Sequence, residues 1–534
     1  MIRARHLLVS LLLVSSCASA QEGPVSTQGI QTAAEASGFT HTSRWAEVQT
    51  FLDSLEELPH ASRLEQRVLG SSHEGRELPL VVVSKSPTDL GERSERLRVV
   101  CIGNIHAGEV EGKEAIQALC REFAMGEHAA LLEHMEIWFV PIYNADGNER
   151  VNERNRESQN GPVEGVGIRP NAQGFDLNRD FLKAEAPETR ALLSLWNQLD
   201  PHVFIDLHTT NGSYHGYHLT YSPSLSTNAD PGLNRFAREV LLPEVTQVLE
   251  ETQGLRTYHY GNFSRRGEAS WSTYDHRPRF GTNAFGLRGR LAVLSEAYSY
   301  LPFEERVVAT RGFVLQLFES LATHREELQA ACAHADKLAT EGKLSFGHDS
   351  SLIPGVQETI AVGGVNEIQL GEGRGVRREV TDELSYDPML VRSEFASGTW
   401  EPLPEAWAVV GDQAAIGRLL RLQGITYEVL EEARAATSQR FQISELTRAK
   451  RPFQGHRTAS VTGHWSPGPE LLPVGTLLVP ARQPRARLAA QLLEPQSEDS
   501  ALTWNVFPAS LGLGPGGIDG SGAELSYPIL RVAE

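Results

Sequence analysis

The sequence has few sulfur-containing residues, with four cysteines and four methionines among 534 positions. One cysteine, Cys17, lies close to the N-terminus, and the other three are too few for a disulfide framework in a chain of this size. Cys101 follows the pattern of a buried strand, and Cys120 and Cys332 follow helical patterns. We therefore expect all three to be buried free thiols in a fold held together by its hydrophobic core.

The chain also lacks an excess of positive charge and long apolar segments. Its 49 Lys and Arg against 68 Asp and Glu give a formal net charge of −19, which argues against nucleic acid or an anionic membrane surface as a partner. Beyond the N-terminus no run approaches 18 uninterrupted apolar residues, so no transmembrane segment is predicted. A G-x-G-x-x-G pattern at 512–517 has no strand before it and no helix after it, which indicates a glycine-rich loop.

The N-terminus has the features of an export signal. Two arginines precede the apolar stretch 7–14, and Ala18-Ser19-Ala20 is a small-x-small cleavage pattern. The sequence predicts a signal peptide over 1–20 and a secreted or periplasmic protein. Residues 14–17 also resemble a lipobox, so lipidation at Cys17 and a cell-envelope lipoprotein remain an alternative.

Fully apolar strands alternate with helical patterns between residues 42 and 335. Candidate strands lie at 97–102, 137–143, 203–207 and 291–294, and candidate helices at 113–123, 188–199 and 303–332. Strands that are apolar throughout are typical of a sheet covered on both faces. We predict an α/β fold, with a doubly wound, mostly parallel but mixed sheet and helices on both faces.

The remaining regions differ in composition. Residues 21–41 are rich in Gly, Ser, Thr and Ala and are predicted to be a flexible lead-in. After residue 342 Gly and Pro become frequent. A strand–helix–strand unit at 407–430, a strand at 476–479 and a helix at 486–493 indicate one or two α/β or β-rich accessory modules in 345–534. Their role is not readable from the sequence.

Four polar side chains follow or end different buried strands. His106 and Glu109 occupy a strand-to-helix turn at the H-x-x-E spacing of two catalytic zinc ligands, although such a turn also occurs without metal. His208 ends a second strand and is a candidate third ligand. Glu296 follows a third strand, where a buried carboxylate is costly unless it is paired or functional. Together they form a predicted three-ligand metal site plus a base, with the fourth metal position left open for water.

Several motifs occur in the order found in a known family. They are His106-Ala107-Gly108-Glu109, Asn144-Ala145-Asp146-Gly147, Gly174-Phe175-Asp176-Leu177-Asn178-Arg179, Asp206-Leu207-His208 and Ser295-Glu296. With these motifs, residues 42–335 resemble the catalytic domain of the zinc carboxypeptidases (carboxypeptidase A-like metallopeptidases), here as a large exported member of bacterial type. The resemblance implies one Zn²⁺ per chain, held by His106, Glu109 and His208, with Glu296 as the general base.

The same resemblance implies the remaining site residues. Arg169 matches the arginine that polarises the scissile carbonyl, with Arg150, Arg154 and Arg156 as competitors for that role. Asn178 and Arg179 match the pair that binds the terminal carboxylate of the substrate. Tyr274, 22 residues before Glu296, stands near the place of a mobile substrate-binding tyrosine, but its surroundings are not a clear match.

Three features depart from the pattern or stay open. Asp180 stands where many members have Asn, and Arg288 and Arg290 lie close to the base, either as structural residues or facing an acidic part of the substrate. Glu111, two residues after Glu109, is interpreted as an N-terminal helix carboxylate and not as a ligand.

The predicted function is exported, zinc-dependent hydrolysis of C-terminal peptide bonds, with peptide or protein C-termini as substrates. One alternative is another amide hydrolase on the same scaffold, either a peptidoglycan endopeptidase or an N-acyl amino acid deacylase. A second alternative is a catalytically inactive protein that binds peptides or glycans. Retention of the metal-site residues and of Glu296 argues against the second alternative.

Overall fold

The computed structural model describes residues 29–86, 95–210, 212–264, 268–508, 510–512 and 526–533. The predicted signal peptide, Cys17 and nearly all of the 512–517 loop lie outside these residues. Residues 29–41, the described part of the predicted lead-in, contain the short helix α1 (Ala33–Ala36), and Glu35 pairs with Arg121 in α3. This part of the lead-in is therefore folded against the N-terminal half. Within the described residues, no helix combines the length and apolar character needed to cross a membrane.

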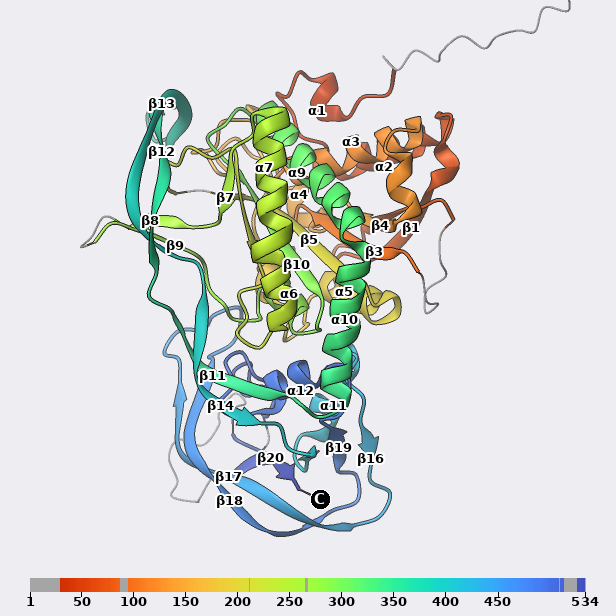
Figure 1. Cartoon of the computed structure of the whole chain (residues 1–534), viewed down its shortest axis with the longest axis vertical. Coiled ribbons are helices and arrows are strands. Elements are labelled where there is room, and N and C mark those ends of the chain that lie inside the picture. The colour runs from red at the N-terminus through yellow and green to blue at the C-terminus, as the bar shows by residue number, and fades with distance from the viewer. Residues whose placement is uncertain are drawn as a thin grey trace, which may run out of the picture.

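An eight-stranded mixed sheet forms the centre of the upper body in Figure 1. Its order is β1 (Leu64–Ser71), β2 (Glu77–Val83), β4 (Met135–Val140), β3 (Leu97–Gly103), β5 (Val203–Thr210), β10 (Leu291–Tyr298), β6 (Leu219–Pro223) and β7 (Thr257–His259). The central strands β4, β3, β5 and β10 run parallel, and the pairs β1–β2, β2–β4 and β10–β6 are antiparallel. β3, β4 and β5 are buried along their whole length, which explains their continuous apolar sequence.

Helices cover both faces of this sheet, as the α/β prediction requires. Val100 and Ile102 of β3 pack with residues of α5 (Pro187–Leu199) and α8 (Gly281–Gly286). Val99 and Cys101 point to the other face and pack with residues of four helices, which are α2 (Trp45–Ser54), α3 (Glu111–Met125), α7 (Leu242–Gln253) and α9 (Phe303–Thr323). Two short helices, α4 (Ala145–Asn148) and α6 (Pro231–Phe236), complete this half. The predicted α/β class with a mixed sheet is confirmed.

The C-terminal region begins after α10 (Arg325–Thr340), which reaches down to the lower body in Figure 1. Its largest sheet has the order β16 (Glu428–Val429), β19 (Leu477–Pro480), β15 (Ala406–Val409), β20 (Ser526–Val532), β17 (Arg434–Arg448) and β18 (Ala459–Leu472). The helices α11 (Gln413–Leu422) and α12 (Ala486–Leu493) coincide with the helices predicted there. Trp407, Leu419 and Leu492 join the same core cluster as Leu192 and Trp196 of α5, so the two halves share one hydrophobic core.

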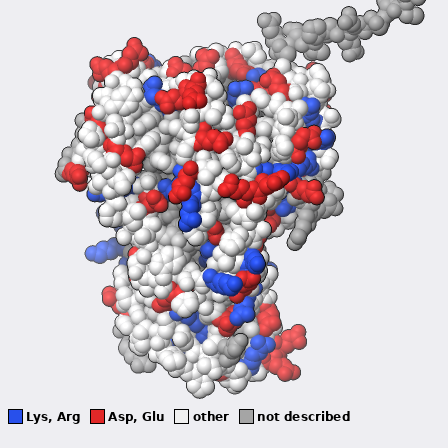
Figure 2. Space-filling view, in the orientation of Figure 1, with Lys and Arg blue, Asp and Glu red and all other residues white. Residues whose placement is uncertain are grey.

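Other strands of the C-terminal region return to the N-terminal half. The hairpin β12 (Val356–Gln369) and β13 (Val376–Arg392) rises beside the upper body in Figure 1. β13 pairs with β9 (Ser270–Ser272), which pairs with β8 (Asn262–Ser264), so one sheet contains strands of both halves. β11 (Ser345–Leu352) and β14 (Phe395–Pro402) form a separate pair at the junction. On the face drawn in Figure 2, acidic and basic side chains are interspersed and form no continuous basic surface.

Candidate metal centre and active site

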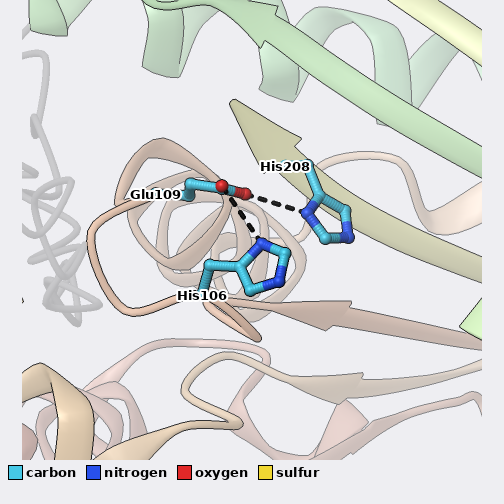
Figure 3. A group of neighbouring side chains, drawn as sticks. All are labelled: His106, Glu109 and His208. Carbon is cyan, nitrogen blue, oxygen red and sulfur yellow. Dashed lines mark hydrogen bonds and ion pairs between the residues drawn. The ribbon is translucent and has the colours of Figure 1, made fainter. Parts of the chain in front are cut away.

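Three side chains converge at the carboxyl ends of two adjacent strands: His106 and Glu109 from the turn after β3, and His208 from β5 (Figure 3). After β3, Asn104 takes a left-handed conformation (φ 64°) and donates from Nδ2 to the Glu109 carbonyl oxygen at 3.1 Å, which shapes the turn before α3. Nδ1 of His106 lies 3.1 Å from Glu109 Oε1, and Nδ1 of His208 lies 2.8 Å from Glu109 Oε2. The three candidate ligand atoms all lie within 4.8 Å of one another. Two imidazole nitrogens and a carboxylate oxygen at this spacing fit a His₂Glu zinc site with an open fourth position.

Each histidine is also held by a second carboxylate. Nε2 of His106 lies 3.0 Å from Asp176 Oδ1, and Nε2 of His208 lies 2.9 Å from Asp206 Oδ2. A carboxylate on the far ring nitrogen is the usual arrangement for a metal-binding histidine, because it fixes the ring and raises its basicity. Sequence reasoning assigned no role to either aspartate. The signal for Asp206 was its position two residues before His208, which puts both on one face of β5.

Charge at this centre is concentrated in a volume shielded from water. Burial raises the pKa of Glu109, but Arg156, with which it forms an ion pair, and His106 together hold that pKa well below its ordinary range. Burial lowers the pKa of His208, but Asp206 and Glu109 hold it well above its usual value. The buried carboxylates thus favour a positive charge at the point where the ligand atoms meet. This electrostatic preference is a second reason that the residues fit a divalent cation.

Glu296 lies beside the metal centre without belonging to the ligand group. In the parallel pairing of β10 with β5, Glu296 is the direct partner of His208, so both side chains emerge on the same face. Both line a cavity of about 480 Å³. Burial raises the pKa of Glu296 to about 8; His208 opposes this shift and the Glu109 carboxylate adds to it. A carboxylate of raised pKa next to a metal centre is suited to accepting and returning a proton.

The structure brings the predicted substrate-binding residues to the same cavity, which Arg169, Asn178 and Arg179 all line. Arg169 donates from Nε to Asp176 Oδ2 at 2.8 Å, and its Nη1 is 3.8 Å from Glu109. Asn178 and Arg179 belong to a 3₁₀ turn at Leu177–Arg179, where Asn178 Oδ1 accepts from the Gly281 backbone N–H at 2.8 Å. The Arg179 guanidinium lies over the Phe280 ring, 3.9 Å from its centroid.

Tyr274 also lines the cavity and is held at its wall. Its hydroxyl is 2.9 Å from Thr282 Oγ1, and its ring makes edge contacts with Tyr260 and Phe280. Burial raises its pKa, so it stays neutral. Sequence reasoning did not identify the other wall residues, which are Thr209, Thr210, Tyr260, Asp275, Arg277, Arg279, Phe280, Thr282, Leu294 and Phe453.

The other arginines that the sequence singled out do not line this cavity. Arg150 pairs with Glu74, and Arg156 pairs with Glu109; of the arginines considered for the carbonyl, Arg169 is the one that lines the cavity. Arg288 contacts Asn197 and Gln423, and Arg290 pairs with Asp200 and Asp336, so both are structural.

The structure also shows the surroundings of Glu111, Asp180 and the cysteines. Glu111 lies buried in the first turn of α3 near Thr209 and Arg306, outside the ligand group. Asp180 is buried and accepts from the backbone N–H of Ala186 at 2.8 Å. The cysteines of the described residues are free and buried, namely Cys101, Cys120 and Cys332.

Comparison with known proteins identifies the family. Residues 48–277 match the family model described as zinc carboxypeptidase. Carboxypeptidase 2 of Trichophyton tonsurans is 24% identical over 490 residues, which cover 86% of this chain and 81% of that protein. Carboxypeptidase 2 of Trichophyton rubrum is 24% identical over 467 residues, which cover 83% of this chain and 80% of that protein. Human carboxypeptidase Z is 31% identical over 220 residues, 34% of this chain and 31% of that protein.

A solved metallo-carboxypeptidase of Burkholderia cenocepacia is also similar, with 17% identity, a TM-score of 0.39, and coverage of 52% of this chain and 69% of that one. The Trichophyton alignments extend over more of the chain than residues 1–344 provide, so they include part of the accessory region. Residues 48–277 thus place this part of the chain in the zinc carboxypeptidase family, and the protein is a metallocarboxypeptidase, a hydrolase whose cofactor is zinc.

Proposed function

We propose that this metallocarboxypeptidase is an exported enzyme that removes C-terminal residues from peptides or proteins, with residues 42–335 as its catalytic domain. The observation that carries the proposal is one cavity containing four functional groups. These groups are the His106–Glu109–His208 ligand set, the proton acceptor Glu296, and two arginines, Arg169 and Arg179. A peptide end offers matching groups, namely a carbonyl to be attacked and a free carboxylate to be bound.

The proton chemistry belongs to Glu296. When zinc is bound by His106, Glu109 and His208, it supplies a Lewis acid and makes water nucleophilic at neutral pH. Glu296 takes a proton from the attacking water as the oxygen adds to the carbonyl carbon. It then gives the proton to the leaving amine nitrogen, so that the C–N bond breaks, a new carboxyl group forms on the shortened peptide and the C-terminal residue leaves with a free amine.

The arginines orient the peptide. Arg169 places a permanent positive charge within 3.8 Å of Glu109, close enough to stabilise the developing oxyanion. Arg179 and Asn178 bind the terminal carboxylate, since a guanidinium can donate two parallel hydrogen bonds to it. Tyr274, with its neutral hydroxyl at the cavity wall, supports substrate binding.

Export is part of the proposal and rests on the sequence of residues 1–20, with cleavage after Ala20 or lipidation at Cys17. Fractionation of cells expressing the full-length gene, followed by mass analysis of the mature N-terminus, distinguishes these two outcomes. A protein retaining Met1 in the cytoplasmic fraction would contradict both.

The reaction is tested by incubating the purified enzyme with a peptide library and identifying products by mass. We expect stepwise loss of C-terminal residues, abolished by a zinc chelator and restored by zinc. Internal cleavage, cleavage restricted to muropeptide crosslinks, or release of acyl groups would instead identify another amide hydrolase. Binding without any product would identify an inactive protein.

A further inference from the structure

The accessory region contributes a side chain to the substrate cavity. Phe453 lines this cavity together with Arg179, Arg279 and Phe280 of the catalytic half. It lies in the loop 449–458 that joins β17 to β18, and two backbone hydrogen bonds between Phe453 and His456, of 2.8 and 3.0 Å, close this loop into a tight turn. The tip of the β17–β18 hairpin thus reaches the active site.

The tip is fixed against residues of the metal centre and its neighbours. Gln454 Oε1 accepts a hydrogen bond from the backbone N–H of Asp176 at 2.9 Å, and Asp176 also holds the ligand His106. His456 lies 3.0 Å from Glu185. Because both contacts are made by residues that follow Phe453 within the same tight turn, the position of Phe453 relative to the metal centre is defined.

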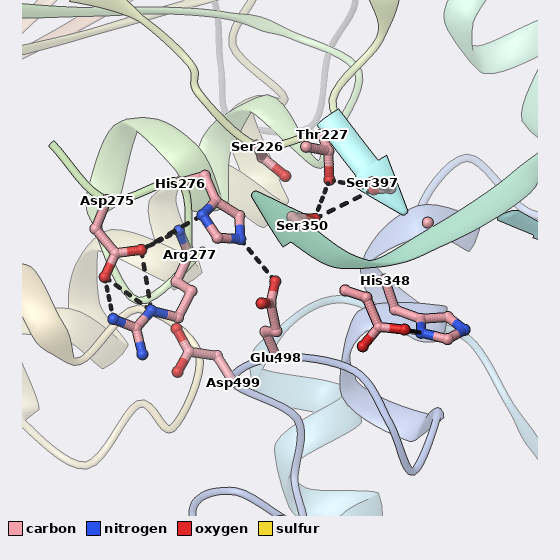
Figure 4. Close-up of polar contacts among 12 residues, drawn as sticks. Ser226, Thr227, Asp275, His276, Arg277, His348, Ser350, Ser397, Glu498 and Asp499 are labelled. Carbon is pink, nitrogen blue, oxygen red and sulfur yellow. Dashed lines mark hydrogen bonds and ion pairs between the residues drawn. The ribbon is translucent and has the colours of Figure 1, made fainter. Parts of the chain in front are cut away.

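Two further contacts join the segment 274–280 to the accessory region. Arg279 forms a buried, two-pronged contact with Asp499 and lies over the Phe453 ring, 5.1 Å from its centroid. The adjacent His276 contacts Glu498 at 2.6 Å, as Figure 4 shows. The segment 274–280 therefore has substrate-facing residues on one side and accessory-region partners on the other. The accessory region is built into the wall of the site and is not a detached module.

Phe453 differs from the other wall residues in how much apolar surface it leaves free. It is 38% exposed although it is large and hydrophobic, and Tyr274, Phe280 and Leu294, which line the same cavity, add further apolar surface. The charged wall residues nearby are already engaged: Arg277 with Asp275, and Arg279 with Asp499. An aromatic surface next to arginines offers no counter-charge to a basic substrate side chain, whereas it gains free energy by burying an apolar one.

We propose that Phe453 is a specificity-determining residue that contacts the side chain of the residue bound through its carboxylate by Arg179, and that it favours large apolar C-terminal residues. This inference rests on the proposed function. It assigns to the region 345–534 a direct role in substrate selection.

The test compares variants on two blocked dipeptides that differ only in a C-terminal Phe or Ala. We expect Phe453→Ala to raise KM for the Phe substrate by about ten-fold, with kcat and the Ala substrate changed by less than about two-fold. Phe453→Leu, which keeps apolar bulk at the tip, should restore most of the loss. Trp400→Ala, at an aromatic residue of the accessory region that is 54% exposed, is the matched control and should change neither substrate.

Zinc content and unfolding temperature of each variant separate a lost contact from a lost fold. If Phe453→Ala unfolds more readily, Phe453→Gln, which keeps bulk at the tip but is polar, takes its place and must show the loss confined to the Phe substrate. Equal changes for both substrates, or none, would overturn the role of Phe453 while leaving the proposed function intact. A wild-type enzyme that releases no C-terminal residue from any peptide would instead refute the proposed function itself.

Discussion

Glu296 is the direct neighbour of His208 across the parallel pairing of β10 and β5. The side chains of paired residues lie on the same face of a sheet, about 5 Å apart. One strand therefore carries a candidate ligand and the next carries the proposed proton acceptor, and backbone hydrogen bonds fix the distance between them. Because this relationship depends on the rigid centre of the sheet and not on a loop, the site is preorganised before any substrate binds.

Substitution of the proton acceptor should separate chemistry from metal binding. Glu296→Gln keeps the size of the side chain but removes its ability to take a proton. We expect hydrolysis of C-terminal peptide substrates to fall by roughly 10²–10⁴-fold with one zinc per chain retained. Steady-state kinetics and metal analysis measure the two quantities. Glu304→Gln, at an exposed position of α9, is the control, and wild-type turnover in Glu296→Gln would exclude the assigned role.

The pH dependence of kcat/KM should follow the same carboxylate. Only the ionised form of Glu296 accepts a proton, so activity should rise as pH increases through its pKa. Burial raises this pKa from its ordinary 4.5 to about 8, and the positive charge of bound zinc acts in the opposite direction. We therefore expect the midpoint of the acidic limb of the kcat/KM profile to lie between pH 4.5 and about 8. Arg169→Gln removes a charge that favours the carboxylate, so the limb of its residual activity should move to higher pH.

A limb at or below pH 4.5 in the wild-type enzyme would mean that Glu296 is not the group that titrates. The same conclusion would follow if the limb of Arg169→Gln moved to lower pH. Both profiles require only initial rates measured well below KM.

The second carboxylate on each histidine should determine zinc affinity. Asp206→Asn and Asp176→Asn keep the shape of the side chain but remove the negative charge that contacts the far ring nitrogen of a ligand. We expect each to lower zinc affinity by about 10–100-fold, measured by competition with a chromophoric chelator. Asp53→Asn, at an exposed residue of α2, should leave affinity unchanged. Unaltered zinc affinity in both variants would show that these second carboxylates do not contribute to zinc binding.

Removal of zinc should also destabilise the fold locally. Without a cation, the buried Glu109 carboxylate depends on histidine protons and on Arg156 for its charge balance. A thousand-fold excess of zinc over its Kd stabilises the native state by about 4 kcal/mol. Differential scanning fluorimetry should therefore show a lower unfolding temperature after chelation, which zinc restores and magnesium does not. An unchanged unfolding temperature would indicate that the purified protein carried no zinc at this site.

Recognition of the substrate end should depend on Arg179. A free carboxylate can take two charge-assisted hydrogen bonds from it, whereas a C-terminal amide cannot. We expect the wild-type enzyme to prefer the acid over the matched amide, and Arg179→Ala to lose roughly 10–100-fold on the acid with little change on the amide. The amide substrate is thus an internal control. Equal losses on both substrates would show that Arg179 acts elsewhere.

Local sequence patterns were sufficient to predict the central strands of the sheet and the candidate ligand group. Continuous apolar runs predicted β3, β4, β5 and β10, because a strand buried on both faces is mostly apolar along its length. The predicted strands also placed the H-x-x-E turn and the polar residues at strand ends close together, since the carboxyl ends of parallel strands meet at one edge of the sheet. The helix Ala486–Leu493 was predicted with its observed bounds.

Contacts between residues far apart in the sequence determined the C-terminal hairpins and the remaining residues of the cavity wall. The strands of the β12–β13 and β17–β18 hairpins are mostly half-exposed, so they carry too few apolar residues for a period-two pattern to reveal them. Arg169 and Arg156 look alike in the sequence, and only the folded loop shows which one faces the cavity. Gln454 meets Asp176 across 278 residues of chain, and Phe453 enters the cavity beside it. The sequence by itself determined which residues could hold a metal, because those signals are local. Only the tertiary structure decided which distant residues surround it, because their contacts depend on how the two halves pack.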